Sequence, residues 1–412
     1  MNIWILHAGW DISLNISQRR GRYVHLIEEL ERRNHSIVQW IPTFNHYTKI
    51  HEFSQNTIKR YSNNHDVYFI HANGYTHNVS LQRIFFYIEL GQKFRTMIKN
   101  MHKPDVIISG IPSVEWCYEA ARYAKDNNIP FILDVRDLWP DILLTIIPKI
   151  IRPIGRIILY PFFNKMQYAC RNASGICGIS KNYVQWALRQ ANRPTTPCDK
   201  IFYLGENTYE ISNLDRDNCL AKIRKMGVDV QKTLCCFAGL FEKSYDVETV
   251  INAAHFLQNN NDESIQFVLC GTGSKLEYLK KKASGLNNVV FLGWCDQKLM
   301  HVIGTLSSIG LIPCSHDAMQ SLPNKPFFYM SHGMILASTL RGEMNEIIFN
   351  HDIGFTYEFG NYKQLATTIR DIVHEPRKLN MMKQNSLELF EKKFKLSTIT
   401  SEFTNYVESF VC

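Results

Sequence analysis

Charged residues crowd the stretch ILDVRDLWPD, which directly follows a strongly apolar run in the first half of the chain. Its charged residues include Asp134, Arg136 and Asp137. Side chains of these kinds can orient substrate hydroxyls, or they can pair with one another and hold a loop in place. Two carboxylates can also bind a metal or act as the catalytic pair of a hydrolase. The arginine disfavours a cation between the two acids. It also keeps both carboxylates ionised, which removes the proton donor that a hydrolase pair needs. A substrate-binding role and a structural bracket both stay open.

A second polar group follows the apolar run DVYFIHA, which ends at residue 72. His71 lies at this end, and Tyr75, His77 and Asn78 follow on one loop. Hydroxyl, imidazole and amide groups on a single loop suit a polyhydroxylated ligand such as a sugar, although a lone histidine is more often a buried core residue. The sequence contains no HExxH, GxSxG or Walker A motif.

In the second half, glycines and lysines mark the ends of apolar runs. The stretches are GLFEKSYD (239–246), CGTGS (270–274) and SLPNKPFFYMSHG (321–333). Backbone amides in glycine turns, together with Lys243 or Lys325, suit a diphosphate. The GTG turn by itself is equally well explained as a tight connection between a strand and a helix.

Short apolar runs alternate with amphipathic helical patterns along the whole chain. This alternation predicts mostly parallel sheets with helices on both faces, in two halves that meet near residue 205. Ligands of such sheets bind at the carboxyl ends of the strands. Strands are expected at 3–8, 36–41, 66–72, 105–110, 130–135, 233–239, 265–273, 288–293 and 309–314, and helices at 22–35, 113–128 and 246–260.

Length and composition predict an ordinary folded protein of two domains. The chain has 412 residues, of which 45% are hydrophobic and 20% are charged. Its eleven cysteines lack metal-ligand spacing, so we expect reduced thiols in the cytosol. The N-terminus enters a strand pattern directly, and we expect no signal peptide.

The net charge of +8 is unevenly placed, because residues 142–198 contain eight Lys and Arg but no Asp or Glu. Within this span, IIPKIIRPIGRIILYPFF (146–163) alternates bulky apolar residues with cations and is too interrupted to cross a membrane. It suits an anionic membrane surface, or else a helix packed on its own domain with a basic rim. No nucleic-acid-binding module is recognisable, so we expect no nucleic acid partner.

Several stretches resemble a known family. GLFEKSYDVETVINAA, FVLCGTG, NVVFLGW and PNKPFFYMSHGMILAS, in this order, resemble the donor-binding half of glycosyltransferase family 4. The first half is similar to a bacterial branch of that family that builds surface polysaccharides. The stretches that carry this likeness are GRYVHLIEELERRNHSIVQW, TFNHYTK, GYTHNVSLQR, DVRDLWPD and GISKNYVQWAL.

The resemblance implies the GT-B fold, an α/β fold with two Rossmann-like doubly wound domains facing a cleft. Residues 1–205 would bind the acceptor, residues 206–390 would bind the nucleotide-sugar donor, and residues 391–412 would form a C-terminal helix that returns to the first domain. It also implies a retaining hexosyl- or N-acetylhexosaminyltransferase with a lipid-linked saccharide acceptor, in O-antigen or capsule synthesis. Such enzymes need no cofactor or metal. The protein would be cytoplasmic and peripheral on the inner face of the cytoplasmic membrane.

Site residues follow from the matched motifs. The implied donor-binding residues are Gly239, Lys243, Gly271, Gly273, Trp294, Asn324, Lys325, Phe328, Gly333, Gly342 and Glu343. The implied catalytic residues are Arg136, Asp137 and His71. The implied acceptor-binding residues are Arg19, Arg22, Tyr75, Asn78 and Asp134. Arg136 stands about where many members carry a histidine, so it would orient hydroxyls or phosphate.

The chain also departs from the family pattern. Many members carry two glutamates eight positions apart, where this chain has Gln320 and Phe328. Leu240 replaces a frequent arginine, Glu242 a glycine, and Asn34 the glycine of a usual Gly-His pair. A missing carboxylate at Phe328 removes hydrogen bonds to ribose worth about 1.5–3 kcal/mol each. Two alternatives therefore stay open: a nucleotide-sugar 2-epimerase on the same fold, and a non-catalytic GT-B subunit that partners a transferase.

Overall fold

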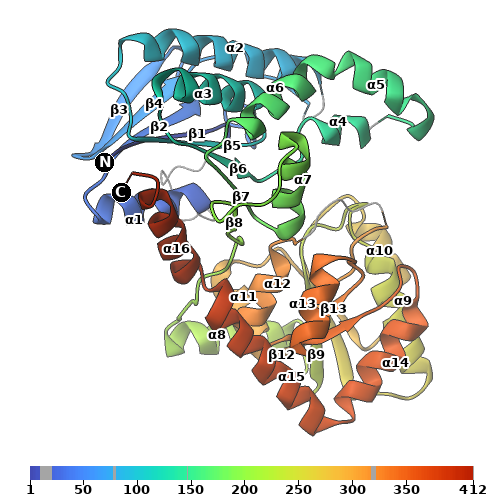
Figure 1. Ribbon diagram of the computed structural model, residues 1–412. Coiled ribbons are helices and arrows are strands. Elements are labelled where there is room, and N and C mark those ends of the chain that lie inside the picture. Colours follow the sequence, from blue (N-terminus) through green and yellow to red (C-terminus); the bar gives the residue numbers. More distant parts are fainter. Residues whose placement is uncertain (10–20, 78–79, 146, 317–321, 412) are drawn as a thin grey trace. The chain divides into compact units, whose positions relative to one another are not determined.

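The computed structural model describes residues 1–9, 21–77, 80–145, 147–316 and 322–411, which divide into two compact α/β units (Figure 1). The first unit comprises Met1–Tyr203 and Ile399–Cys412, and the second comprises Leu204–Thr398. Each unit is built on one sheet.

The first unit contains an eight-stranded sheet in the order β3-β4-β2-β1-β5-β6-β7-β8. Only β3 runs antiparallel to its neighbour, β4. The strands are β1 (Asn2–His7), β2 (Ser36–Pro42), β3 (Thr57–Ser62), β4 (His65–Ile70), β5 (Val106–Gly110), β6 (Phe131–Val135), β7 (Gly175–Gly178) and β8 (Lys200–Ile201). The helices are α1 (Arg22–Arg32), α2 (Leu81–Met97), α3 (Val114–Asn127), α4 (Asp141–Thr145), α5 (Arg152–Ile158), α6 (Tyr160–Arg171), α7 (Lys181–Ala191) and α16 (Leu396–Glu408).

Alternate side chains of the central strands fill two separate cores, as expected for a doubly wound sheet. Trp4 and Leu6 of β1 face a core shared with α2, α3, α6 and α7. Ile3 and Ile5 face the opposite core, which α1 and α16 close. The C-terminal helix therefore completes the first unit, although it follows the second unit in sequence (Figure 1).

Helix α1 ends three residues before the predicted boundary, because the chain turns at Asn34 with a φ of 63°. This is the left-handed region, which glycine adopts freely and asparagine tolerates better than most residues. Asn34 thus ends the helix in a backbone conformation that glycine adopts freely.

The second unit contains a six-stranded, fully parallel sheet in the order β11-β10-β9-β12-β13-β14. The strands are β9 (Thr233–Ala238), β10 (Ile265–Cys270), β11 (Val289–Gly293), β12 (Ser307–Ile312), β13 (Ile335–Ser338) and β14 (Gly354–Thr356). The helices are α8 (Asn213–Lys225), α9 (Val247–Asn259), α10 (Leu276–Lys282), α11 (Gln297–Leu306), α12 (Lys325–Ser331), α13 (Glu343–His351), α14 (Tyr362–Val373) and α15 (Pro376–Leu389). Helices α9 and α14 cover one face, and α12 packs on β12 and β13.

In each sheet the parallel strands end on a common edge, called here the carboxyl edge of that sheet. Several of the loops that leave this edge lead into helices with capped N-termini. Ser80, Ser113 and Ser180 cap α2, α3 and α7 in the first unit, and Asp246 and Asp296 cap α9 and α11 in the second. Within the described part of the chain, every helix is too short or too polar to cross a bilayer.

Candidate functional site

Lys325 is the most unusual charged residue at the carboxyl edge of the second sheet. It begins α12, and its Nζ lies 3.7 Å from the ring centroid of Tyr245 and 5.3 Å from that of Phe237. Burial lowers the pKa of Lys325 to about 8. No carboxylate among the described residues forms an ion pair with it, and the faces of two aromatic rings and the backbone of Gly239 lie against this largely buried cation.

Two glycines let this lysine lie directly against the backbone. A Cβ added at Gly239 would lie 2.8 Å from Cε of Lys325 and closer still to its Nζ. At Gly271 the φ is 142°, and an added Cβ would lie 2.9 Å from the carbonyl carbon of Gly239. Side chains are therefore excluded where β9 and β10 end, and a ligand at this point meets the ammonium group and bare backbone.

The glycine turn after β10 already holds an anion from the protein itself. The carboxylate of Glu242 accepts hydrogen bonds from the backbone N–H and the hydroxyl of Ser274, both at 2.7 Å. These bonds lower the pKa of Glu242. The Ser274 amide is thus not open to a diphosphate. Of the phosphate contacts predicted from the sequence, Lys325 is therefore better placed than this glycine turn.

Most of the predicted donor residues lie on this same carboxyl edge. Lys243 and Asn324 are exposed there, and Trp294 leaves 74% of its surface open after β11. Gly342, with a φ of 68°, precedes α13, whose first residue Glu343 is buried. Gly273 follows Gly271 in the turn after β10.

Gly333 does not belong to this group, which corrects one prediction. Helix α12 begins at the carboxyl edge and runs back along the sheet, so Gly333 lies after its last turn and just before β13. Its φ of 65° turns the chain into β13. The residue therefore reverses the chain at the opposite edge and has no access to a donor at the carboxyl edge.

Phe328, one turn into α12, stands on a surface of aromatic rings and imidazoles. Its ring centroid lies 4.6 Å from that of His332, and its carbonyl accepts from the hydroxyl of Ser331 at 2.8 Å. Nε2 of His332 is 3.1 Å from Nδ1 of His301. Burial lowers the pKa of both histidines, so the pair is neutral at pH 7. Gln320, Arg19 and Asn78 lie outside the described residues.

In the first unit, Asp134 is fully buried rather than open to an acceptor, and this corrects a second prediction. Its carboxylate accepts from the Tyr23 hydroxyl at 2.8 Å and lies 3.4 Å from a guanidinium nitrogen of Arg22. Arg22 is itself 7% exposed and donates to the carbonyl of Phe202 at 3.0 Å. Asp134 and Arg22 therefore form a buried ion pair beneath the carboxyl edge, in the interior of the first unit.

Arg136 and Asp137 remain at the carboxyl edge, directly after β6. The guanidinium of Arg136 lies 4.9 Å from the Tyr23 ring centroid, and Asp137 accepts a bond from the Leu138 N–H at 2.8 Å. Burial raises the pKa of Asp137 despite this bond and the nearby arginines. Both residues are far along this edge from His71, which is the third predicted catalytic residue.

His71 follows β4, and three strands lie between β4 and β6. At the usual spacing of strands this is a separation of about 19 Å. Nδ1 of His71 lies 3.1 Å from the Thr43 hydroxyl and 3.2 Å from the Phe53 carbonyl. The structure therefore does not place His71 beside Arg136 and Asp137, and its ring has partners within its own loop cluster.

Tyr75 gathers residues that the sequence did not single out. Lys49 Nζ lies 4.5 Å and Arg83 Cζ 5.5 Å from its ring centroid, and its hydroxyl lies 2.6 Å from His46 Nδ1. The guanidinium of Arg83 also lies 4.8 Å from the Trp139 ring centroid. The matched stretches TFNHYTK and GYTHNVSLQR contain these residues, but nothing in their spacing shows that they meet.

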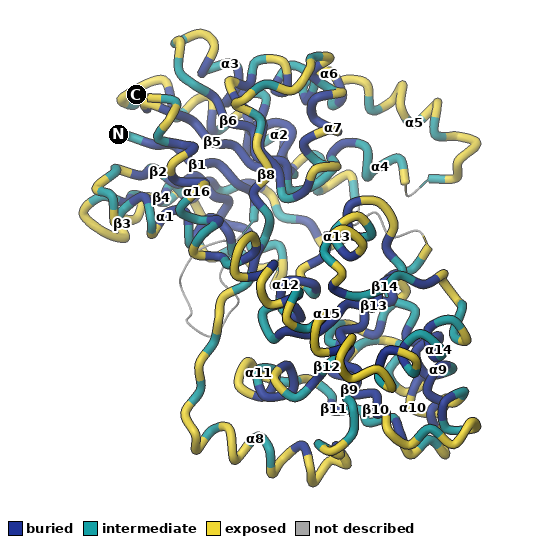
Figure 2. Tube along the Cα trace, turned by 60° about the horizontal axis from the view of Figure 1, so that its bottom comes forward, coloured by how far each residue is buried: buried dark blue, intermediate teal, exposed yellow. Residues whose placement is uncertain are grey.

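The segment 149–160 is largely exposed (Figure 2), and it carries apolar side chains among cations. Its exposed apolar side chains are Ile150, Ile151, Ile154, Ile157, Ile158 and Tyr160. The exposed fraction reaches 87% at Ile150 and 74% at Ile157. This outcome disagrees with a helix packed on its own domain, because such a helix would bury these residues.

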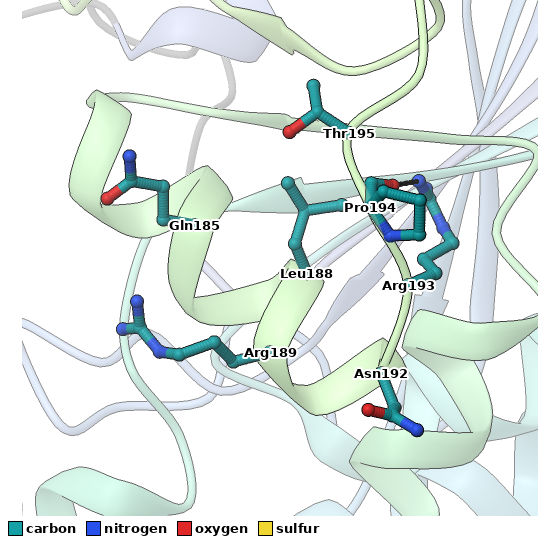
Figure 3. A pocket seen from close by; sticks show the side chains of 7 residues that line it. All are labelled: Gln185, Leu188, Arg189, Asn192, Arg193, Pro194 and Thr195. Carbon is teal, nitrogen blue, oxygen red and sulfur yellow. Dashed lines mark hydrogen bonds between the residues drawn. The ribbon is translucent and has the colours of Figure 1, made fainter.

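A shallow pocket of the first unit lies away from all of these groups (Figure 3). It is formed at the C-terminal end of α7, which is the edge opposite the strand ends. The lining residues are Gln185, Leu188, Arg189, Asn192, Arg193, Pro194 and Thr195. Both carboxylate oxygens of Asp199 pair with Arg193, at 2.6 and 2.7 Å. The pocket contains none of the predicted site residues.

The described residues contain no group of three or more His, Cys, Asp and Glu side chains that could hold a metal ion.

Among curated protein sequences, none matches the chain. Residues 221–388, which are most of the second unit, match the family model described as glycosyl transferases group 1.

Solved structures resemble the chain over nearly its whole length. HepE of Anabaena in complex with UDP has 13% identity and a TM-score of 0.66, with 99% of this chain and 100% of that chain covered. Sucrose-phosphate synthase of Thermosynechococcus elongatus has 12% identity and a TM-score of 0.72, covering 99% and 98%. A trehalose-6-phosphate protein of E. coli bound to UDP-2-fluoro glucose has 10% identity and a TM-score of 0.69, covering 99% of each.

These likenesses confirm the GT-B fold class that the sequence predicted, with its two α/β units. The match to the family model places a glycosyl transferases group 1 domain in the second unit.

Proposed function

We propose that the protein is a retaining glycosyltransferase of family 4 that moves a sugar from a nucleotide-sugar donor to a lipid-linked saccharide, in the synthesis of a bacterial surface polysaccharide. The observation that carries this proposal is Lys325, a largely buried cation against bare backbone at the carboxyl edge of the group 1 domain. The resembling HepE structures contain UDP or UDP-glucose, which favours a nucleotide sugar as the donor.

Lys325 would hold the diphosphate of this donor. Negative charge builds on the leaving diphosphate as the bond to the sugar breaks, and a cation in a partly water-excluded site stabilises that charge. Two aromatic rings already surround the ammonium group, so it loses little hydration when the donor binds. The diphosphate would then restore a high pKa to Lys325 and become its ion-pair partner.

The other residues of the edge would complete the donor site. Trp294 offers an exposed ring for the nucleotide base, and Lys243 is a second cation for the phosphates. Arg136 and Asp137 would orient the reacting hydroxyl of the acceptor, without forming a covalent intermediate. The donor itself supplies the leaving group, and no metal or cofactor is required in this scheme.

The lipid-linked acceptor is proposed from the segment 149–160. Exposed isoleucines beside Lys149, Arg152 and Arg156 would enter the headgroup region of an anionic membrane, where apolar burial and charge attraction add. The absence of acids from 142 to 198 removes the repulsion that would oppose this contact. The protein would then lie on the inner face of the cytoplasmic membrane.

Calorimetric titration with UDP-, GDP- and dTDP-sugars tests the donor site. We expect one of them to bind the wild type, to bind Lys325→Met about 30-fold to 100-fold more weakly, and to bind Lys281→Met normally. Lys281 is an exposed lysine of α10 and serves as the matched control. Equal affinity for all three proteins would contradict the proposal, and no binding at all would favour a non-catalytic subunit.

Product analysis by mass spectrometry separates transfer from epimerisation. The enzyme is incubated with its nucleotide sugar, first alone and then with a lipid-linked saccharide. A lengthened saccharide is the expected result. A new epimer of the donor without any acceptor would instead establish the 2-epimerase reading.

Vesicle flotation tests the membrane contact. The wild type is expected to float with anionic vesicles, and the triple change of Ile150, Ile154 and Ile157 to Ser is expected to remain unbound. Phe349→Ser removes a similarly exposed apolar side chain from the second unit and should float like the wild type. Unchanged flotation of the triple variant would contradict the role of this segment.

A further inference from the structure

We propose that Cys295 and Cys270 form an oxidation site at the carboxyl edge of the second sheet. A peroxide oxidises the thiol of Cys295, Cys270 then closes a disulfide with it, and this bond weakens the binding of the nucleotide sugar. The effect on the nucleotide sugar rests on the proposed function. The oxidation site itself rests on the position and exposure of the thiols.

Three neighbouring strands bring thiols together at this edge. Cys236 lies in β9, Cys270 is the last residue of β10, and Cys295 lies in the loop after β11. Strand β10 pairs with β9 on one side and with β11 on the other. The Cys270 thiol lies within hydrogen-bonding reach of the thiols of Cys236 and Cys295. All three are free cysteines.

The backbone at the end of β11 turns Cys295 toward Cys270. The pairing of β10 with β11 shifts after Leu269, so that Cys270 pairs with Gly293. Gly293 has a φ of 68°, a conformation that glycine adopts without strain. Its carbonyl accepts from the Gly271 N–H at 2.7 Å and from Sγ of Cys295 at 3.6 Å. One carbonyl therefore joins Cys295 to the residue next to Cys270.

The thiols differ in their access to solvent. Cys295 is partly exposed and lies between two exposed residues, Trp294 and Asp296. Cys270 is only 2% exposed, and Cys236 is fully buried. A small oxidant in solution therefore meets Cys295 first, and Cys270 can react only with a group that Cys295 already carries.

Hydrogen bonding gives the two thiols different protonation. The bond from the Cys270 thiol lowers the pKa of Cys295, and Lys222 of α8 lowers it further, against the opposite effects of burial and Asp296. Bonds to Cys236 and Cys295, together with burial, raise the pKa of Cys270 well above its ordinary value. Because the thiolate is the reactive form of cysteine, Cys295 is the nucleophile and Cys270 keeps its proton.

Other cysteines of the chain lack this combination. Cys117 and Cys170 are fully buried, and burial raises the pKa of both thiols, as expected for cysteines that only pack. Cys219 is partly exposed like Cys295, but burial and nearby acids raise its pKa. Exposure, a lowered pKa and a second thiol within reach occur together at Cys295.

The reaction consumes one hydrogen peroxide and forms two waters. The Cys295 thiolate attacks one oxygen of the peroxide, the O–O bond breaks, and the hydroxide that leaves takes up a proton to form water. The sulfur of Cys270 then attacks the sulfur of the resulting sulfenic acid. The S–O bond breaks, and the hydroxyl group leaves as water with the Cys270 proton. The two thiols together lose two electrons, which reduce the peroxide.

The disulfide would act on the donor site through the loop after β11. A disulfide holds two sulfurs closer together than a hydrogen bond does, so oxidation draws this loop toward the end of β10. The loop carries Trp294, which is proposed to contact the nucleotide base. The end of β10 continues into Gly271, where an added Cβ would lie 2.9 Å from the carbonyl carbon of Gly239. With so little room at this point, the pull displaces backbone that the donor contacts.

Mass spectrometry of the full-length protein tests the oxidation site. The protein is treated with hydrogen peroxide, its remaining thiols are alkylated under denaturing conditions without reductant, and it is digested with trypsin. Cleavage after Lys and Arg places Cys270 in the peptide 244–275 and Cys295 in the peptide 283–298. We expect these two peptides to be linked, and the link to disappear with dithiothreitol.

Three variants assign the roles of the thiols. Cys295→Ser should form no link, and in Cys270→Ser dimedone should label Cys295 as a sulfenic acid. Cys219→Ser is the matched control and should link like the wild type. In the reduced wild type at pH 7, iodoacetamide should alkylate Cys295 about ten-fold faster than Cys219. Equal alkylation rates, no linked peptide, or a link from Cys295 to Cys219 instead of Cys270 would each overturn the proposal.

Calorimetry measures the effect on the donor, with the UDP-, GDP- or dTDP-sugar that binds the reduced protein. Affinity should fall about ten-fold after oxidation and recover with dithiothreitol, and peroxide should not change the affinity of Cys295→Ser. A linked protein with unchanged affinity would overturn the effect on the donor. Failure of the proposed function appears separately, as absent binding to the reduced wild type, because the peptide link is measured without any nucleotide sugar. Since Cys295 is partly exposed, Cys295→Ser keeps the test valid if Cys270→Ser unfolds.

Discussion

Asp134 in the first unit and Lys325 in the second are both charged residues next to a strand end, and both are largely removed from water. Asp134 has a hydroxyl donor and a guanidinium as partners, and both are themselves buried. Lys325 has aromatic rings and backbone around it, and no described carboxylate pairs with it. A paired buried charge stabilises the fold, whereas a buried charge without such a partner costs stability and is ready for a ligand.

The largest expected effect is on the paired side of this comparison. Asp134→Ala leaves the guanidinium of Arg22 buried without its carboxylate, and we expect the free energy of unfolding to fall by about 3–5 kcal/mol. Urea unfolding followed by tryptophan fluorescence measures it, because Trp4, Trp40 and Trp116 are buried in the first unit.

The exposed residue Asp126 gives the control for this change. Asp126→Ala should alter the unfolding free energy by less than about 0.5 kcal/mol. A comparably small loss for Asp134→Ala would mean that the buried pair does not stabilise the first unit.

The second largest effect is an increase in stability, and it is expected on the unpaired side of the comparison. Lys325→Met should stabilise the ligand-free protein by about 1–3 kcal/mol at pH 7, because it removes a buried charge whose pKa is held at about 8. The same variant should lose donor binding, as described above. Thermal unfolding with and without the nucleotide sugar shows both effects, and a destabilised variant would contradict an unpaired role for Lys325.

The pH dependence of donor binding sharpens the contrast. The folded-state pKa of Lys325 lies below its unfolded value, so the native protein binds fewer protons between about pH 8 and pH 10, and ligand-free stability rises with pH through that window. Donor affinity should be level below about pH 7 and fall as the pH rises above 8. Calorimetry from pH 6 to pH 9.5 measures this, and Lys325→Met should remove this fall.

The smallest expected change concerns Phe328, which lies one turn from Lys325. Phe328→Glu restores the carboxylate that many family members carry there and should tighten donor binding about three-fold to ten-fold, since charged hydrogen bonds to ribose are regained. The new carboxylate would also face His332 and raise its pKa. Weaker or unchanged affinity in titration would mean that the Phe328–His332 surface receives the donor differently.

The pattern of apolar runs was sufficient to predict the two doubly wound sheets and the strand ends at which the site residues lie. It also placed Lys325 and the glycine turns at the ends of apolar runs. Local periodicity and turn residues carry this information, because strand and helix formation depend mainly on near neighbours in sequence.

The sequence pattern did not predict the order of the strands in each sheet or which charged residues are buried. His71 and Arg136 both follow strands, but their separation depends on the three strands that assemble between β4 and β6. Asp134 looked like a cleft residue because its partners Tyr23 and Arg22 are more than a hundred positions away in the chain. Gly333 is remote from the donor edge because α12 begins at that edge and runs back along the sheet.

By itself, the sequence determined the fold class, the excess of cations in residues 142–198 and the residue types available at each strand end. Only the tertiary structure decided which charges are paired and which remain for ligands. Lys49, Tyr75 and Arg83 meet because β2 and β4 pair, Glu242 occupies the Ser274 amide, and the isoleucines of 149–160 stay exposed. The physical reason is that hydrogen bonds, ion pairs and burial depend on contacts between residues that are distant in sequence, and such contacts exist only after packing.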